Sequence, residues 1–422
     1  MIMRLGVEVM KRLLKISFDS LFFSLMPIIQ WFLLGLLVDK NLINVFSITY
    51  PLQFMYSLIK SIFGVAPNIQ AEKESNKNSV MSGLVLGIFF TFLIFGLFAI
   101  NVDSFISFMH MDVHVYHNFC LFSIAQLGLH SIFVIMIEKF YYEEKNTKAN
   151  IHIILFNILS LFSLFVFSLI IKDQVIIITG SLLMMVIFII VMYMLEFEKF
   201  KMDFKVFKSI KYDSVDALDS LLFFFIYFFG LSNASNFGVQ YLAALNFVAL
   251  ITDCQWDSFA AINEAAKIDL AKNKYDNRKS LKNAYRLLFI LYSAIILMFI
   301  IMYNGYELNL GLVAIYLSVE IFDLAIYPIY SLKTCYLNLE YSSVKMTTNM
   351  FIASGIRVVS SFLPIPFCTS LGQLISSIYQ LITTNIYMKK FKKIKSREKE
   401  YEFRTIEGGE KEYEFRTIES GV

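Results

Sequence analysis

The chain has 422 residues, of which 57% are hydrophobic and 17% are charged, with a formal net charge of +3 and a mean hydropathy of +0.63. Soluble domains carry about 25% charged residues, so this composition excludes a soluble globular protein of this length. The cysteines are scattered, and their spacing suggests neither a disulfide framework nor a zinc motif.

Apolar blocks follow one another along the chain, and each is long enough to cross a bilayer, which takes about 20 residues. The first block lacks a small-residue cleavage site, so we expect a retained helix rather than a signal peptide. The sequence therefore predicts an all-α integral membrane protein with twelve transmembrane helices, at 16–38, 43–66, 80–100, 116–137, 150–171, 175–195, 212–231, 238–258, 283–303, 309–332, 344–363 and 368–388.

Basic residues show which loops face the cytoplasm, because lysine and arginine accumulate on that side of membrane proteins. They cluster before the first predicted span, in every second loop and after the last span. The intervening loops contribute only Lys40 and Lys172. We therefore expect a multi-pass protein of the plasma membrane with both termini in the cytoplasm.

The longest basic connection, 196–211, divides the spans into six plus six. "NIQAEKESNKNSV" after the second span resembles "NEAAKIDLAKNKY" after the eighth, which indicates an internal repeat in one orientation. We expect two six-helix lobes, 1–195 and 212–390, around a central cavity. The remainder, 391–422, is predicted to be a cytoplasmic tail, and the duplicated "EKEYEFRTIE" within it is left out of the fold prediction.

Four stretches resemble the multidrug and toxic compound extrusion (MATE) family of transporters. They are "LLGLLVDK" near the end of the first predicted span, "FYYEEKNTKANIHIILFNIL" (140–159), "YLAALNFVALITDCQWDSFAAINEAAKIDLA" (241–271) and "SGIRVVSSFLPIPFCTSLGQLISSIY" (354–379). Their order and spacing carry the resemblance over most of the chain. It implies a MATE-like fold and alternating access between the two lobes.

The resemblance also implies roles for two acids. Asp39 stands where the family has an acidic coupling residue in its first span, and Asp219 stands where many members have an acid in the seventh. The sequence departs from the family elsewhere. Pro27 lies about a turn later than the usual proline, and only Asn157 lies near the position of a second first-lobe acid. We therefore expect a divergent member.

Ionisable side chains inside a span cost roughly 2.5–3.5 kcal/mol at the helix centre, so they are retained mainly where they face a cavity or a partner. The rise of about 1.5 Å per residue places Asp219, Asp253 and Asp323 at similar depths, with Glu320 one turn above Asp323. We expect these acids to converge in the second lobe. With Asp39 they are the predicted ion-coupling residues, for a proton or sodium.

Simpler roles exist for the same acids. Asp253 and Asp257 would be solvated at the cytoplasmic interface if the eighth span ends early. Asp219 would be an acid of a first helical turn. Asp39 would merely end the first span, and either acid of the tenth span would pair with Arg357.

Residues of both signs are candidates for binding the cargo: Gln30, Lys60, Asn157, Asp257 and Arg357. A pocket of mixed charge suits a zwitterion or a peptide. Lys60 would otherwise snorkel to the interface or need an acidic partner, and Gln30 and Asn157 would cross-link helices.

The stretch "HMDVHVYH" places His110, His114 and His117 on one face if it is helical, and three such histidines can ligate a metal. A lead-in helix at the membrane interface is the interpretation we favour, so we assign no metal ligands.

These observations together predict an ion-coupled antiporter that exports an amphipathic cationic or zwitterionic small molecule or peptide. Glycine-rich phosphate loops and nucleophile–base pairings are absent, so we expect no enzymatic activity and no cofactor. We expect the lipid bilayer and the cargo as partners, no nucleic acid, and a monomer. Two alternatives use the same fold: a flippase for a lipid-linked saccharide or peptide, and a non-transporting receptor or immunity protein.

Overall fold

Every regular element is a helix in the residues that the computed structural model describes, which are 29–30, 33–35, 39–252 apart from 144, 172 and 213, then 256, 280–286, 289, 293, 296–297 and 308–407. This agrees with the all-α prediction. The predicted spans at 16–38 and 283–303 lie largely outside this part of the chain.

The first half begins with a single long apolar helix. A 3₁₀ turn, η1 (Lys40–Val45), leads into α2 (Phe46–Ile59), a π-helical turn η2 (Lys60–Val65) and α3 (Ala66–Glu74). The later helices of this half are α4 (Asn78–Ile100), α5 (Val102–Phe108), α6 (Val113–Tyr142), α7 (Asn146–Ile170) and α8 (Gln174–Glu196).

The connection predicted at 196–211 contains a further short helix, η3 (Phe204–Tyr212), which packs against α3. The second half consists of α9 (Ser214–Asn236), the helix Val239–Thr252, α12 (Leu310–Glu340), α13 (Ser343–Ser361) and α14 (Cys368–Glu407). α14 continues as one helix past residue 391, where a separate tail was predicted to begin. Residues 408–422 lie outside the described part.

Polar caps set the starts of several of these helices. Asp112, Asp173, Asn309 and Ser342 each accept hydrogen bonds from the first free backbone N–H groups of α6, α8, α12 and α13. Such caps satisfy donors that a helix cannot satisfy itself. Because each cap lies in a short polar gap between apolar blocks, the observed starts fall within a few residues of the predicted ones.

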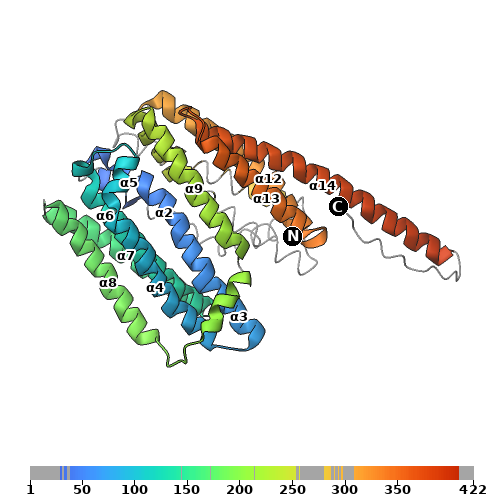
Figure 1. Ribbon diagram of the computed structural model, residues 1–422, viewed down its shortest axis with the longest axis horizontal. Helices are drawn as coiled ribbons and strands as arrows, with labels where there is room; N and C mark the ends of the chain where they lie inside the picture. The colour runs from blue at the N-terminus through green and yellow to red at the C-terminus, as the bar shows by residue number, and fades with distance from the viewer. Residues whose placement is uncertain are drawn as a thin grey trace.

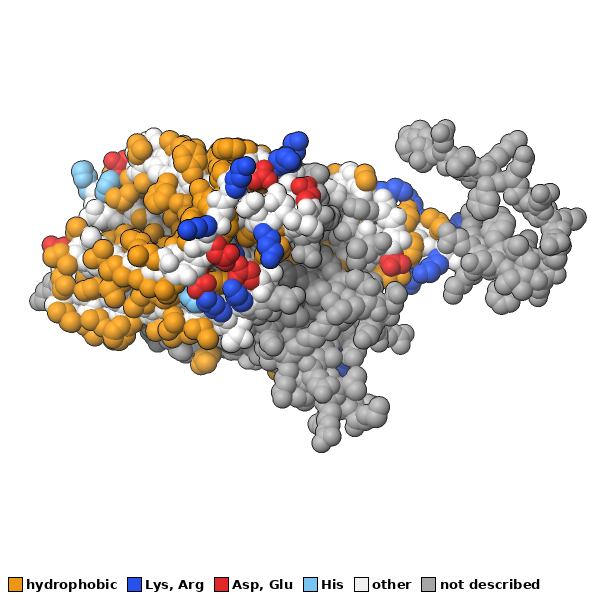
Figure 2. Space-filling view, turned by 90° about the horizontal axis from the view of Figure 1, so that it is seen from below, with side chains coloured by type: hydrophobic (Ala, Val, Ile, Leu, Met, Phe, Trp, Pro, Cys, Tyr) orange, Lys and Arg blue, Asp and Glu red, His pale blue; other side chains and the backbone are white. Residues whose placement is uncertain are grey.

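Seven helices in the described residues are long and apolar enough to cross a membrane: Leu42–Ala71, Asn78–Ile100, Val113–Tyr142, Thr147–Ile170, Val175–Glu196, Ala217–Asn236 and Leu310–Asn338. Large apolar side chains on them point outward, as Phe92 and Met194 do. Figure 2 shows this apolar surface around a patch of charged side chains. α13 and α14 coincide with the predicted spans 344–363 and 368–388, but they are less apolar because they carry Arg357 and many serines and threonines.

The two halves meet along α2 and α9, which pack side by side between the first-half helices α4, α6, α7 and α8 and the second-half helices α12, α13 and α14 (Figure 1). Hydrogen bonds cross this junction near the predicted external ends. The Asn246 amide donates to Ser47 Oγ at 2.7 Å, and Ser232 donates to the Phe108 carbonyl at 2.9 Å. His110 Nδ1 lies 2.9 Å from Ser235 Oγ. The halves are therefore joined on that side of the molecule.

Candidate functional site

Two carboxylates lie one turn apart on α12, deep in the second half. Glu320 is 8% exposed and Asp323 is 1% exposed. Spacing of three residues places both on one face of the helix. Burying ionised carboxylates is costly unless charge or hydrogen bonds compensate them, so their surroundings decide what they can do.

One neutral side chain on α14 holds this pair. Gln373 Nε2 donates to Glu320 Oε2 at 3.0 Å and to Asp323 Oδ2 at 2.7 Å. The second Asp323 oxygen, Oδ1, is buried and has no hydrogen-bond partner among the described residues. Ser377 lies beside Asp323 and Trp256 beside Glu320. The pair therefore has hydrogen bonds from neutral groups and one buried acceptor that a proton or cation would satisfy.

Arg357 reaches the pair through the same glutamine. Its Nη2 lies 3.4 Å from the accepting Gln373 Oε1 and 3.1 Å from the accepting Tyr227 hydroxyl. The guanidinium also lies over the Phe223 ring, 4.7 Å from its centroid, in a cation–π arrangement. The expected direct pairing of an acid with Arg357 is thus replaced by a bridge through Gln373.

This group of residues extends to the first half through aromatic rings. Tyr227 stacks on Phe54 of α2 with a centroid distance of 5.4 Å. The ring of Tyr50, also on α2, meets the Tyr227 ring edge-on with centroids 4.7 Å apart. Phe54 also stacks on Phe223 at 5.4 Å. The site therefore runs from α12 and α14, through Arg357 on α13, to the junction between α9 and α2.

Sequence reasoning missed Gln373, Tyr227 and Phe223. A glutamine inside the predicted span 368–388 was a usable signal for the first, because an amide in a span needs a partner. Aromatic residues are too common in this chain for the other two to stand out.

The other predicted coupling acids of the second half are Asp219 and Asp253, and the predicted cargo-binding residue Asp257 is close to Asp253 in sequence. Asp219 is half-buried on α9, one turn before Phe223, and is not among the charged groups that act on Glu320 or Asp323. Asp253 and Asp257 lie outside the described residues. Of the four acids expected to converge, the structure brings Glu320 and Asp323 together, and the convergence of Asp219 and Asp253 with them stays a prediction.

Asp39 lies in the other half of the molecule, directly before η1. It is half-buried, its backbone N–H donates to the Leu34 carbonyl at 3.2 Å, and its charge acts on Tyr116 of α6. Asp39 thus occupies a first-half location near the predicted external ends of α2 and α6.

Lys60 has an acidic partner. Its Nζ lies 3.2 Å from Glu138 Oε1 of α6, and a Cβ on Gly64 would come within 3.0 Å of the Glu138 side chain. The π-helical turn and the glycine allow this close approach. The structure thus favours the paired interpretation of Lys60 over snorkelling.

Gln30 makes a contact typical of a helix cross-link, whereas the Asn157 amide bonds within its own helix. The Gln30 and Gln126 amides exchange two hydrogen bonds of 2.7 Å, and Gln126 also lies 3.4 Å from Ser160. The Asn157 amide donates to the Ile153 carbonyl at 2.9 Å within α7. Binding of cargo at these residues remains a prediction.

The stretch 110–117 is not one continuous helix, so the condition for three histidines on one helical face is not met. His110 precedes α6 with a positive φ of 53°, and its ring meets Ser235. His117 Nδ1 lies 2.6 Å from Asp103 Oδ1. The cap residue Asp112 marks the start of α6, so His110 lies before this helix and His117 lies within it. No group of three or more ligating side chains occurs among the described residues.

Comparison with solved structures identifies this arrangement of helices. An inward-facing multidrug resistance MATE family transporter of the MOP superfamily matches 89% of this chain and 96% of its own, with a TM-score of 0.64 and 12% identity. An outward-facing structure matches 91% and 97%, with a TM-score of 0.58 and 13% identity. The chain has the MATE transporter fold.

A third solved structure with this fold is a MOP superfamily transporter from Pyrococcus furiosus, described as having a binding pocket of reverse polarity that suggests a different function. It covers 91% of this chain and 96% of its own, with a TM-score of 0.58 and 13% identity. No family model matches the sequence, and no curated protein matches it significantly. The MATE resemblance noted in the sequence thus agrees with the fold at very low identity.

Proposed function

We propose that the protein is a secondary antiporter of the plasma membrane, coupled to protons or sodium, that exports an amphipathic cationic or zwitterionic small molecule or peptide. The observation that carries this proposal is the buried Glu320–Asp323 pair, held by the neutral Gln373 in a MATE fold.

The chemistry follows from charge. Two adjacent buried carboxylates disfavour each other's ionisation, because burial and like charge both oppose it. A proton or a sodium ion relieves this, and so does a cationic group of a cargo. Competition between ion and cargo for one acid pair is a sufficient basis for antiport.

Coupling to alternating access needs the ion to bind two conformations with different affinity. Gln373 touches both acids and Arg357, and Arg357 touches Tyr227 at the junction with α2. Neutralising the acids would weaken the hydrogen bonds that they accept from Gln373. Gln373 would then be held less firmly, and so would the hydrogen bond that it accepts from Arg357. A change of charge in α12 would thereby reach the junction between the halves.

The deep cations favour an antiporter over a flippase for anionic lipid-linked cargo. Lys60 is paired with Glu138, and Arg357 is engaged by Tyr227 and Gln373. Asp323 Oδ1 and Arg357 Nε are both buried without a hydrogen-bond partner among the described residues, so the preference rests on the number of charges at this site, where the two acids Glu320 and Asp323 outnumber the one cation.

Reconstitution into liposomes with an imposed proton or sodium gradient tests the proposal, with ethidium and a zwitterionic dipeptide as probes. We expect gradient-driven accumulation by the wild type and its loss in Asp323→Asn. Glu340→Gln removes one carboxylate from the exposed end of the same helix and should leave flux unchanged. Binding of a probe without gradient-dependent flux would instead support the receptor alternative.

A further inference from the structure

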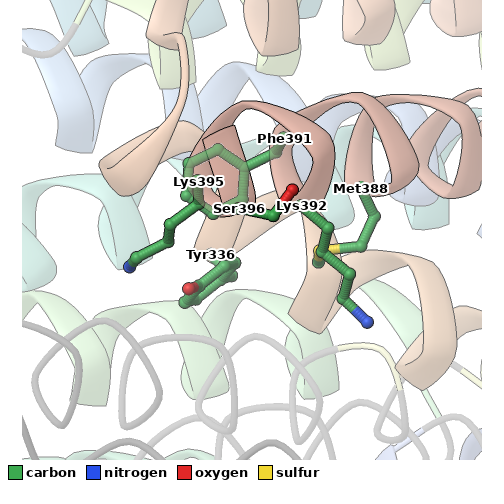
Figure 3. Close-up of a pocket in the computed structure, with 6 residues that line it drawn as sticks. All are labelled: Tyr336, Met388, Phe391, Lys392, Lys395 and Ser396. Carbon is green, nitrogen blue, oxygen red and sulfur yellow. The ribbon is translucent and has the colours of Figure 1, made fainter. Parts of the chain in front are cut away.

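A second polar site lies where α12 and α14 leave the predicted membrane core. A cavity of about 280 Å³ opens there, lined by Tyr336, Met388, Phe391, Lys392, Lys395 and Ser396 (Figure 3). On the same measure a single water molecule needs only about 10–15 Å³, so this cavity is larger than a site for a single ion.

The lining combines cations with aromatic rings. In Figure 3, Lys392 and Lys395 extend from α14 on either side of Tyr336. Tyr336 and Phe391 meet edge-on with centroids 5.8 Å apart, and Lys395 Nζ lies 5.6 Å from the Phe391 centroid. None of the lining residues that the structure describes carries a carboxylate. Two ammonium groups above an apolar floor are complementary to an anion with an apolar attachment.

The surrounding charge has the same sign. Five lysines occur between residues 389 and 395, and α14 contains no acid from Cys368 to Ser396. Lys333 Nζ of α12 donates to the side-chain oxygen Asn385 Oδ1 at 2.6 Å, and Lys392 is close enough to act on Lys333 electrostatically. Like charges gathered in this way are stabilised by an external anion.

The depth of the cavity points to a lipid. Tyr336 lies at the end of the apolar segment Leu310–Asn338, and Met388 is the last residue of the predicted span 368–388. Tyrosines Tyr341 and Tyr387 lie beside Phe391 and each other, as aromatic residues do at the membrane–water interface. Basic clusters directly cytoplasmic of a transmembrane helix attract anionic lipid headgroups.

We propose that this cavity binds the headgroup of an anionic phospholipid from the cytoplasmic leaflet, with its phosphate between Lys392 and Lys395 and its glycerol region against Phe391 and Met388. The site depends on the membrane placement of α12 and α14, and it is independent of ion coupling at Glu320 and Asp323.

Native mass spectrometry of the full-length protein, titrated with dioleoyl phosphatidylglycerol in detergent, tests the site. Lys392→Gln/Lys395→Gln should weaken binding of the first lipid by about tenfold or more, since two surface lysines contribute that much to binding an anionic headgroup. Lys389→Gln/Lys393→Gln is the matched control, because it removes the same charge from exposed positions of the same turns outside the lining. The control should retain the wild-type affinity.

Equal weakening by the two pairs would overturn the proposal, since it would indicate diffuse attraction to the basic helix. Equal binding of phosphatidylcholine would overturn it as well. Displacement of the lipid by an equal concentration of glycerol phosphate or inorganic phosphate would show a site for a soluble anion instead.

A second variant pair tests the floor of the cavity. Tyr336→Phe keeps the ring and should keep binding, whereas Tyr336→Ala should weaken it. Size-exclusion profiles and thermal midpoints of all variants confirm that they are folded, and a folded Lys392→Gln/Lys395→Gln variant with wild-type lipid affinity would refute the site.

Discussion

The two halves of the molecule treat an acid inside the helix bundle differently. In the first half, Glu138 lies 3.2 Å from the ammonium group of Lys60, so its charge is neutralised within the fold. In the second half, Glu320 and Asp323 share the amide of Gln373, which also bonds Arg357, and the guanidinium acts on the two acids electrostatically without pairing directly with either of them among the described contacts. The negative charge of an acid that is paired with a lysine is compensated within the fold. An acid pair whose shared hydrogen-bond partner is neutral is instead stabilised when it binds an external cation or a proton.

The largest effect on transport should come from neutralising the acid pair of the second half. Glu320→Gln/Asp323→Asn leaves no charge to be compensated, so we expect gradient-driven flux to fall at least about tenfold, which corresponds to 1.36 kcal/mol of lost coupling or more. Glu138→Gln should keep flux within about twofold of wild type, because Lys60 already compensates the charge of Glu138. Flux assays in the same liposomes measure both, and equal losses would contradict the contrast.

Gln373→Leu should have the next largest effect. It removes the donor to two carboxylates and an acceptor for Arg357, so we expect the free energy of unfolding to fall by roughly 2–4 kcal/mol, because buried polar groups left without partners cost about 1–3 kcal/mol each. Thermal denaturation in detergent measures this. Adding Glu320→Gln/Asp323→Asn should recover part of the loss, and an absence of recovery would mean that Gln373 does not act through the acids.

A smaller effect is expected at the first-half pair. Lys60 is 39% exposed, so Lys60→Gln should lower the free energy of unfolding by only about 1 kcal/mol. The exchanged pair Lys60→Glu/Glu138→Lys should restore part of it. A double-mutant cycle on thermal stability gives the interaction energy, and a coupling energy of zero would show that the pair contributes nothing.

The smallest effect concerns the junction between the halves. Ser47→Ala removes the acceptor of the Asn246 amide and also the bond from the Ser47 hydroxyl to the Asn44 carbonyl. We therefore expect it to cost about 1 kcal/mol more than a control that loses only a bond of the second kind, because one hydrogen bond usually contributes that much. Thr49→Ala is the control, because its hydroxyl bonds only the Val45 carbonyl of its own helix. Labelling of single cysteines in the junction from the predicted external side should increase for Ser47→Ala and not for the control.

Particular residues show how far prediction reached at the site. Glu320 and Asp323 were predicted as a mid-span pair because three-residue spacing and a hydropathy window are local properties. Their partner Gln373 is 50 residues from Asp323 in sequence, and no periodic pattern relates the two. The same holds for Lys60 and Glu138. The three histidines would share a face only if 110–117 were one helix, and a left-handed residue at His110 and the cap at Asp112 interrupt it.

The sequence alone determined that the chain is a helical membrane protein, where most spans begin and end, and which spans carry acids, because hydropathy, caps and charge act over a few neighbouring residues. Only the tertiary structure decided which buried charges have partners, that α2 and α9 form the junction, and that lysines of α14 form a cavity with Tyr336 of α12. Those features depend on contacts between helices far apart in the chain, where packing rather than periodicity selects the neighbour.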